Sequence, residues 1–61
     1  MYSEILLNFR AKHNLNQTQL AKILGVALNT VHRIECKKNN PSKVNEIKFN
    51  NKMKEWEENK E

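Results

Sequence analysis

The 61-residue sequence predicts an all-α fold. It contains one glycine and one proline, the residues that interrupt regular structure most often. Its β-branched residues are scattered rather than alternating with polar ones, which argues against strands. A chain this short has room for one domain, so we expect residues 1–61 to form a single domain of about four or five helices, with little space for a catalytic cleft.

Each of the first two helices is predicted from a residue that suits a helix cap and from apolar residues spaced so that they fall on one face of a helix. Ser3 suits the N-cap of a helix that ends near residues 13–14. Asn16 and Gln19 have the spacing of a capping box at the start of a second helix, and Gly25 suits its left-handed end. The apolar positions at helical spacing are Ile5, Leu6 and Phe9 in the first helix, and Leu20, Ala21 and Leu24 in the second.

A third helix is expected from about residue 28 to residue 35, with Val31 and Ile34 facing inward. A polar loop follows, and residues 41–42 mark the start of a C-terminal helical or dimerisation segment at about 42–58. In one continuous helix, Val44 and Ile47 share one face, whereas Phe49, Met53 and Trp56 lie on nearly the opposite face. Either the chain breaks near residues 50–51, or another molecule covers the second face. We assign a dimer interface to Phe49, Met53 and Trp56, with a contact inside the monomer as the alternative.

Residues 17–35 have the pattern of a helix-turn-helix. Ala21 is small where two helices cross closely, and Gly25 lets the chain reverse direction. Larger aliphatic residues then fix the crossing so that the second helix projects outward. The predicted core consists of Leu6, Phe9, Leu15, Leu20, Leu24, Val26, Val31 and Ile34.

The charges also favour a polyanionic partner. Residues 1–54 contain ten Lys or Arg and three Glu, whereas residues 55–61 contain four Glu and one Lys, within a net charge of +4. Basic side chains that neutralise phosphates release condensed counterions, so the basic body suits nucleic acid. Ordinary solubilising charge is the alternative interpretation.

These residues resemble the phage repressor and Cro-type (XRE-like) helix-turn-helix family over roughly residues 5–42. The resemblance is carried by Leu-Asn-Gln-Thr-Gln-Leu-Ala at 15–21, Leu-Gly-Val at 24–26, Val31, Arg-Ile-Glu at 33–35, Lys38 and Pro41. It implies a compact four- to five-helix lambda-repressor-like DNA-binding domain, in which the helix after the turn enters the major groove of DNA.

Carried over by position, the resemblance implies three groups of residues. The base-contacting residues are Leu28, Asn29, His32 and Arg33, and their chemistry agrees, since Arg suits guanine and Asn suits adenine. The phosphate-contacting residues are Asn16, Gln17, Lys37, Lys38, Asn39, Asn40 and Lys43. A structural ion pair joins Arg10 to Glu35.

Two departures from the family pattern are evident. Ala27 stands where relatives commonly have Ser or Thr, so the usual N-cap of the third helix is missing. Cys36 and Lys37 stand where many relatives have Asn-Gly, so we expect a strained or differently shaped turn there.

The sequence does not favour a metal site or an enzyme active site. His32 and Cys36 are four residues apart, but a structural zinc site needs four protein ligands and the chain has one cysteine. We expect no metal, no cofactor, no small-molecule substrate and no enzyme activity. The lone cysteine, the lack of a signal-peptide pattern and the short apolar runs favour a soluble cytoplasmic protein without a membrane partner.

The expected function is that of a transcriptional regulator, more specifically a Cro-like repressor that binds a palindromic double-stranded DNA operator as a homodimer. The alternative is a protein-interaction module of the same fold, antirepressor or antitoxin-like, that binds another regulator.

Overall fold

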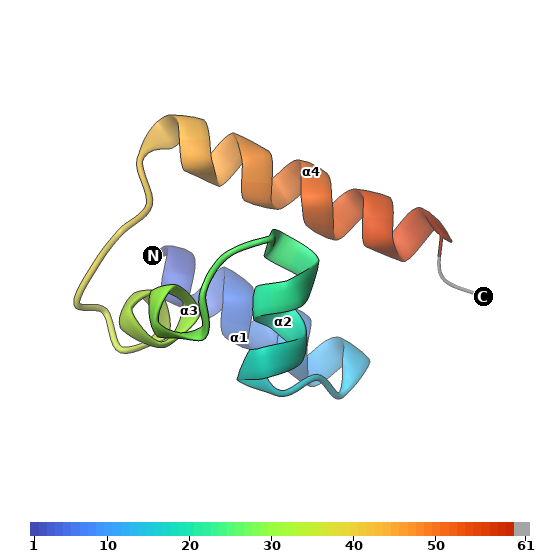
Figure 1. Ribbon diagram of the computed structural model, residues 1–61, viewed down its shortest axis with the longest axis horizontal. Helices are drawn as coiled ribbons and strands as arrows, with labels where there is room; N and C mark the ends of the chain where they lie inside the picture. The colour runs from blue at the N-terminus through green and yellow to red at the C-terminus, as the bar shows by residue number, and fades with distance from the viewer. Residues whose placement is uncertain (60–61) are drawn as a thin grey trace.

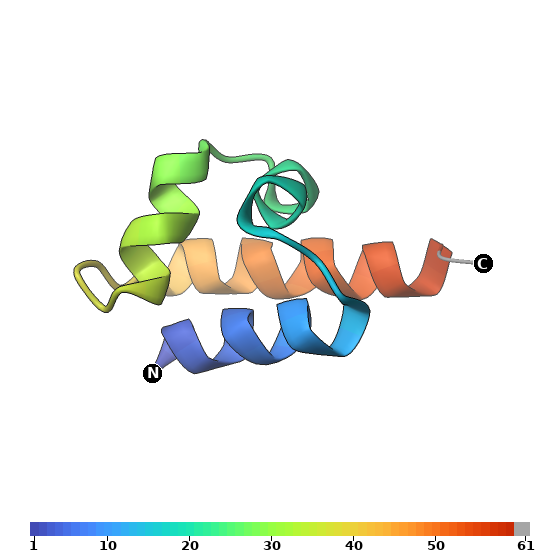
Figure 2. The same ribbon diagram turned by 90° about the horizontal axis from the view of Figure 1, so that it is seen from below.

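The computed structural model describes residues 1–59, which form four helices and no strand. The helices are α1 (Tyr2–His13), α2 (Gln17–Leu24), α3 (Leu28–Glu35) and α4 (Lys43–Asn59). α1 and α4 run side by side, and α2 and α3 pack against them (Figures 1 and 2). The all-α prediction is confirmed for this part of the chain. Residues 60 and 61, the end of the acidic C-terminal segment, lie outside the described residues.

α1 begins earlier than expected and has no side-chain cap. Met1 is its N-cap residue, and Ser3 lies inside the helix with its hydroxyl buried. The expected N-cap at Ser3 is therefore wrong, because Tyr2 is already helical and packs into the core. The Tyr2 hydroxyl donates a hydrogen bond of 2.8 Å to Asn50 Oδ1 on α4. Burial, and secondarily the negative charge of Glu46, raise the pKa of Tyr2 to about 12.

The ends of α2 follow the sequence signals. Asn16 Oδ1 accepts a hydrogen bond from the Gln19 backbone N–H, and Gln19 Oε1 accepts one from the Asn16 backbone N–H, which confirms the capping box. Gly25 ends the helix with φ 73°, a conformation that costs glycine little because it has no Cβ.

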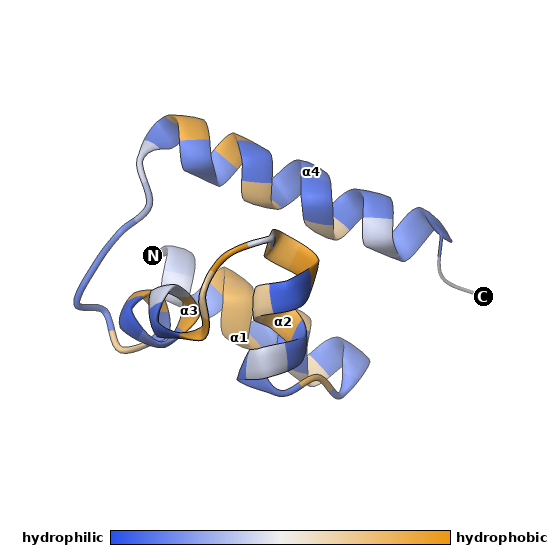
Figure 3. Cartoon of the chain, viewed as in Figure 1, coloured by the Kyte–Doolittle hydropathy of each residue, from blue (hydrophilic) through white to orange (hydrophobic). Residues whose placement is uncertain are grey.

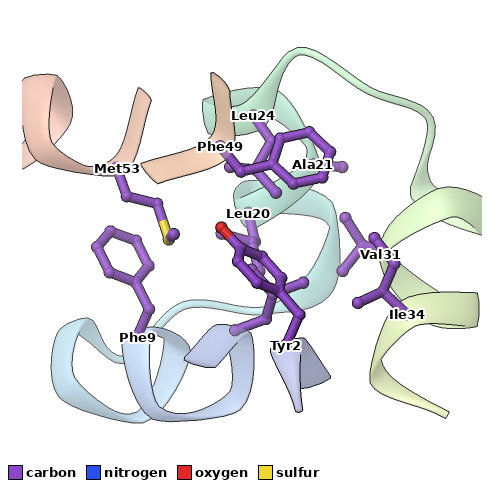
Figure 4. Packing of buried hydrophobic residues seen from close by; sticks show 10 residues of the cluster. Tyr2, Phe9, Leu20, Ala21, Leu24, Val31, Ile34, Phe49 and Met53 are labelled. Carbon is purple, nitrogen blue, oxygen red and sulfur yellow. The ribbon is translucent and has the colours of Figure 1, made fainter. Parts of the chain in front are cut away.

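The core lies between α1 and α4 and beneath the helix-turn-helix (Figure 4). Most of the predicted core is buried, although Leu15 and Val26 are only partly buried at its edge. Ile5, which was expected to share the apolar stripe of the first helix, is exposed. The buried hydrophobic residues are Tyr2, Leu6, Phe9, Leu20, Ala21, Leu24, Val31, Ile34, Phe49 and Met53.

α4 is one continuous helix, so the break considered near residues 50–51 does not occur. Phe49 and Met53 are buried among the chain's own α1 and α2 side chains (Figure 4). The centre of the Trp56 ring lies 5.7 Å from that of the Phe9 ring. Phe49 and Met53 therefore help to close the core of the monomer, as in the alternative of a contact inside the monomer, whereas Trp56 is only partly buried. None of the helices in residues 1–59 is both long and apolar enough to cross a membrane.

Candidate nucleic-acid interface

α3 has one face in the core and one face in solvent. Val31 and Ile34 are buried, which fixes the orientation of the helix against α1 and α2. At 100° per residue, four of the remaining positions form a contiguous outer face. All four residues expected to contact bases are exposed there: Leu28, Asn29, His32 and Arg33.

The outer face of α3 offers several kinds of base contact. A guanidinium and a carboxamide make bidentate contacts with guanine and adenine, and an exposed leucine suits a thymine methyl group. The His32 ring nitrogen Nε2 lies 3.6 Å from Cys36 Sγ, one turn further along. Within residues 1–59 there is no group of three or more His, Cys, Asp or Glu side chains that could hold a metal ion.

The N-terminus of α2 provides backbone donors for an anion. The capping box satisfies the N–H groups of Asn16 and Gln19, and the Leu20 N–H donates to Asn16 O at 3.0 Å. The N–H groups of Gln17 and Thr18 have no acceptor within the helix, as is general for a first turn. Because these donors coincide with the positive end of the helix dipole, they suit a DNA phosphate.

Glu35 joins three helices at this surface. Its Oε1 accepts a hydrogen bond of 2.7 Å from Arg10 Nη1, which is the expected ion pair, and one of 2.8 Å from Gln17 Nε2. The Glu35 side chain is only 5% exposed. The Gln17 side chain is thus held by Glu35, and its backbone N–H is the group left to meet a phosphate.

The loop after α3 is exposed except at Pro41, which is partly buried, and Lys37 in this loop has an unusual backbone conformation. Lys37 has φ 64°, a left-handed conformation that is rare for residues with a Cβ, as expected from the missing glycine. The Lys37 N–H donates to Ile34 O at 3.0 Å, and the Lys38 N–H donates to Arg33 O at 2.9 Å. Lys43 follows as the first residue of α4, whose first turn is capped by a 3.3 Å hydrogen bond from the Asn45 N–H to Ser42 Oγ. The loop residues expected to contact phosphates are all exposed: Lys37, Lys38, Asn39 and Asn40.

Three side-chain contacts between helices were missed by sequence reasoning. The Gln17–Glu35 hydrogen bond links residues in different helices, and neither residue type demands the other. His13 and Lys12 on α1 both contact Glu57 on α4, at 2.7 and 3.3 Å. The opposite charges of the basic body and the acidic C-terminal segment indicate that ion pairs could form between them. The charges do not identify the residues that pair.

Comparison with known proteins supports a role in binding DNA. A family model described as helix-turn-helix matches residues 6–45, which span most of α1, all of α2 and α3, and the start of α4. The XRE-type family that it represents binds DNA, and its members are typically not catalytic. No curated protein and no solved structure shows a significant match.

Proposed function

Because the chain belongs to the XRE-type helix-turn-helix family of DNA-binding proteins, we propose that it is a Cro-like repressor that binds a near-palindromic operator as a homodimer. The observation that carries this proposal is the division of α3 into a face buried by Val31 and Ile34 and a solvent face bearing Asn29 and Arg33. A helix presented in this way fits the major groove. Repression requires only that the bound protein occupy the DNA. We further propose that the protein acts in the cytoplasm.

The proposed roles follow the local geometry. Arg33 and Asn29 read base edges, His32 adds a third polar contact, and Leu28 packs on a thymine methyl group. Phosphates of the DNA backbone are held by the N-terminus of α2, at Asn16 and Gln17, and by the loop after α3. The proposed phosphate contacts of that loop are Lys37, Lys38, Asn39, Asn40 and Lys43, all of which are exposed.

Selection of duplexes from a random pool at near-physiological salt, followed by sequencing, tests this proposal. Enrichment of an inverted repeat with half-sites about 34–36 Å apart would support a dimeric, sequence-specific binder. If no sequence is enriched and binding is insensitive to salt, the proposal is wrong, and a protein partner becomes the better explanation of the same exposed face.

A further inference from the structure

A groove lies between the turn of the helix-turn-helix and α4. Its volume is about 700 Å³, within the range of about 300–1,000 Å³ that is usual for small-molecule sites. Figure 1 shows the end of α2 beneath the middle of α4. None of the residues proposed to contact DNA lines the groove. We call it the turn–α4 groove, after Leu24, Val26 and Thr30 on one side and Lys48, Phe49 and Lys52 on the other.

The floor of the turn–α4 groove is apolar. Leu24 and Phe49 are 4% and 5% exposed, and Val26 is partly buried against the same core. Figure 3 shows the hydrophobic end of α2 and the hydrophobic turn beside a largely hydrophilic α4. Because the core holds these three side chains in place, the floor is formed before a ligand arrives. The part of a ligand that lies on this floor should therefore be apolar.

Two lysines stand on the α4 side of the groove. Lys48 and Lys52 are one helical turn apart, and both are exposed. Within residues 1–59, neither lysine takes part in an ion pair. The described lining has one acidic residue, Glu55, so its positive charges exceed its negative charge. Asn45 and Asn51 add amide groups that can donate hydrogen bonds. The groove therefore suits an anionic group better than a cationic one.

The groove is separate from the surface proposed to meet DNA. The N-terminus of α2, which is proposed to hold a phosphate, lies at the opposite end of that helix from Leu24. Thr30, the α3 residue in the lining, is partly buried and lies one helical turn from the buried Ile34 rather than on the outer face of α3. A ligand in the groove and a DNA duplex would therefore occupy different places on the protein.

We propose that the turn–α4 groove binds a small amphipathic carboxylate. Its carboxylate group lies at Lys48 and Lys52, and its apolar body lies on Leu24, Val26 and Phe49. The two ammonium groups donate charge-assisted hydrogen bonds to the carboxylate, which a neutral ligand of the same shape does not match. A cationic amphiphile would bring a like charge to both lysines. This inference does not depend on the proposed DNA-binding function.

Titration of the full, isotope-labelled chain with decanoate, below the concentration at which micelles form, tests the site. In two-dimensional NMR spectra, saturable changes are expected at the backbone amides of the lining residues and not on the outer face of α3. Decyltrimethylammonium has the same alkyl chain and a cationic head group, and it should bind at least about tenfold more weakly. Changes that never saturate, or equal affinity for the two amphiphiles, would overturn the proposal.

Paired lysine variants separate this site from the general basic charge of the protein. K48Q/K52Q removes both proposed partners of the carboxylate, and the dissociation constant for decanoate is expected to rise by at least about tenfold. K22Q/K54Q is the matched control, because Lys22 and Lys54 are exposed and lie outside the lining. Circular dichroism confirms that both variants remain folded. Equal losses of affinity in the two variants would refute the assignment of the carboxylate to this pair.

An uncharged variant tests the groove itself. Asn45 is exposed and lines the groove, and its backbone N–H rather than its side chain makes the bond to Ser42. Asn45→Trp should therefore fill the groove without removing the cap of α4, and decanoate binding should be lost. Asn8→Trp, at an exposed asparagine of α1 outside the lining, is the control and should bind decanoate as the wild type does. Wild-type affinity in Asn45→Trp would place the ligand elsewhere.

Other occupants of the groove give different results. If a duplex displaces decanoate and K48Q/K52Q loses more DNA affinity than K22Q/K54Q, the lysines are DNA contacts and the proposal is wrong. Concentration-dependent changes at the lining amides without decanoate would assign the groove to a second copy of the chain instead. If decanoate saturates the groove but no duplex is bound, the proposed function fails and the groove assignment stands.

Discussion

Gln17 and Glu35 are joined by a hydrogen bond of 2.8 Å from Gln17 Nε2 to Glu35 Oε1, which ties the first residue of α2 to the last residue of α3. The same oxygen accepts a hydrogen bond of 2.7 Å from Arg10 Nη1 on α1. In the proposed complex, the N-terminus of α2 holds a phosphate and α3 reads bases. Glu35 therefore fixes the relative positions of the two elements that must meet one DNA duplex together.

Replacement of Glu35 by alanine is expected to destabilise the fold strongly. It leaves Arg10, whose side chain is only 25% exposed, without its acidic partner, and removing one member of a buried pair costs about 3 kcal/mol. Urea unfolding followed by the fluorescence of Trp56, the single tryptophan, measures this loss. Lys12→Ala is the control, because it breaks only an exposed ion pair worth about 0–1 kcal/mol. Equal losses in the two variants would show that Glu35 does not have this role.

Arg33 and Lys38 are expected to contribute differently to DNA binding. Arg33→Ala removes a proposed base contact, so affinity for the selected operator falls by about 1–3 kcal/mol and the preference at one base pair is relaxed. Lys38→Ala removes a proposed phosphate contact, so all sequences are weakened alike and the salt slope decreases by about one. Fluorescence anisotropy with operator and scrambled duplexes at several salt concentrations distinguishes these effects. A uniform loss in both variants would contradict the division of roles.

The helix-turn-helix could be predicted because its signals are local. Asn16 and Gln19 need only three residues of separation to form a capping box, and Gly25 reaches the left-handed conformation at the end of α2 at little cost because it has no Cβ. Val31 and Ile34 follow from helical periodicity alone. Each of these features depends on neighbours within one or two turns, so the sequence contains all of the information that they need.

α4 could not be predicted in the same way. Its apolar residues occupy two faces, and periodicity does not say which face the rest of the chain covers. The answer depends on Tyr2 and Phe9, which are forty or more residues away and which pack with Phe49 and Met53 in the core. The Gln17–Glu35 hydrogen bond was missed for the same reason, since it arises only after α2 and α3 have packed together.

Ala27→Ser is expected to stabilise the protein. Ala27 is the N-cap of α3, with extended dihedral angles of φ −70° and ψ 152°, and it has no side chain to accept a hydrogen bond. A serine there can accept from a first-turn N–H of α3, which is worth about 1 kcal/mol. The urea midpoint should rise with an unchanged slope. Ala27→Val, which cannot accept a hydrogen bond, is the control, and an equal rise for valine would contradict capping as the cause.

Lys37→Gly is expected to raise the stability of the protein while lowering its affinity for DNA. Relief of the left-handed conformation at φ 64° should raise the free energy of unfolding by about 1 kcal/mol. Loss of the basic side chain should weaken binding to every duplex, because a phosphate contact disappears. Lys38→Gly is the matched control, since Lys38 does not have a positive φ and glycine there gives no stabilisation. Stability that falls equally in both variants would mean that Lys37 is not strained.

The contact between α1 and the end of α4 is expected to make stability depend on pH. Glu57 Oε2 lies 2.7 Å from His13 Nε2 and 3.3 Å from Lys12 Nζ. The hydrogen bond from His13, followed by that from Lys12, holds the pKa of Glu57 below its ordinary value of 4.5. Because the folded state favours the ionised carboxylate, its contribution is present above pH 4.5 and is lost as the pH falls through the lower folded pKa.

Comparison of the wild type with Glu57→Gln from pH 7 to about pH 3 tests this dependence. Glutamine keeps the size of the side chain but does not ionise, so the wild type should be the more stable protein at neutral pH, and the difference should shrink below pH 4.5. Glu58→Gln removes the same charge from the neighbouring residue, for which no contact to α1 is found among residues 1–59, and serves as the control. A difference between wild type and Glu57→Gln that stays constant through the acid range would show that the α1–α4 contact does not depend on the charge of Glu57.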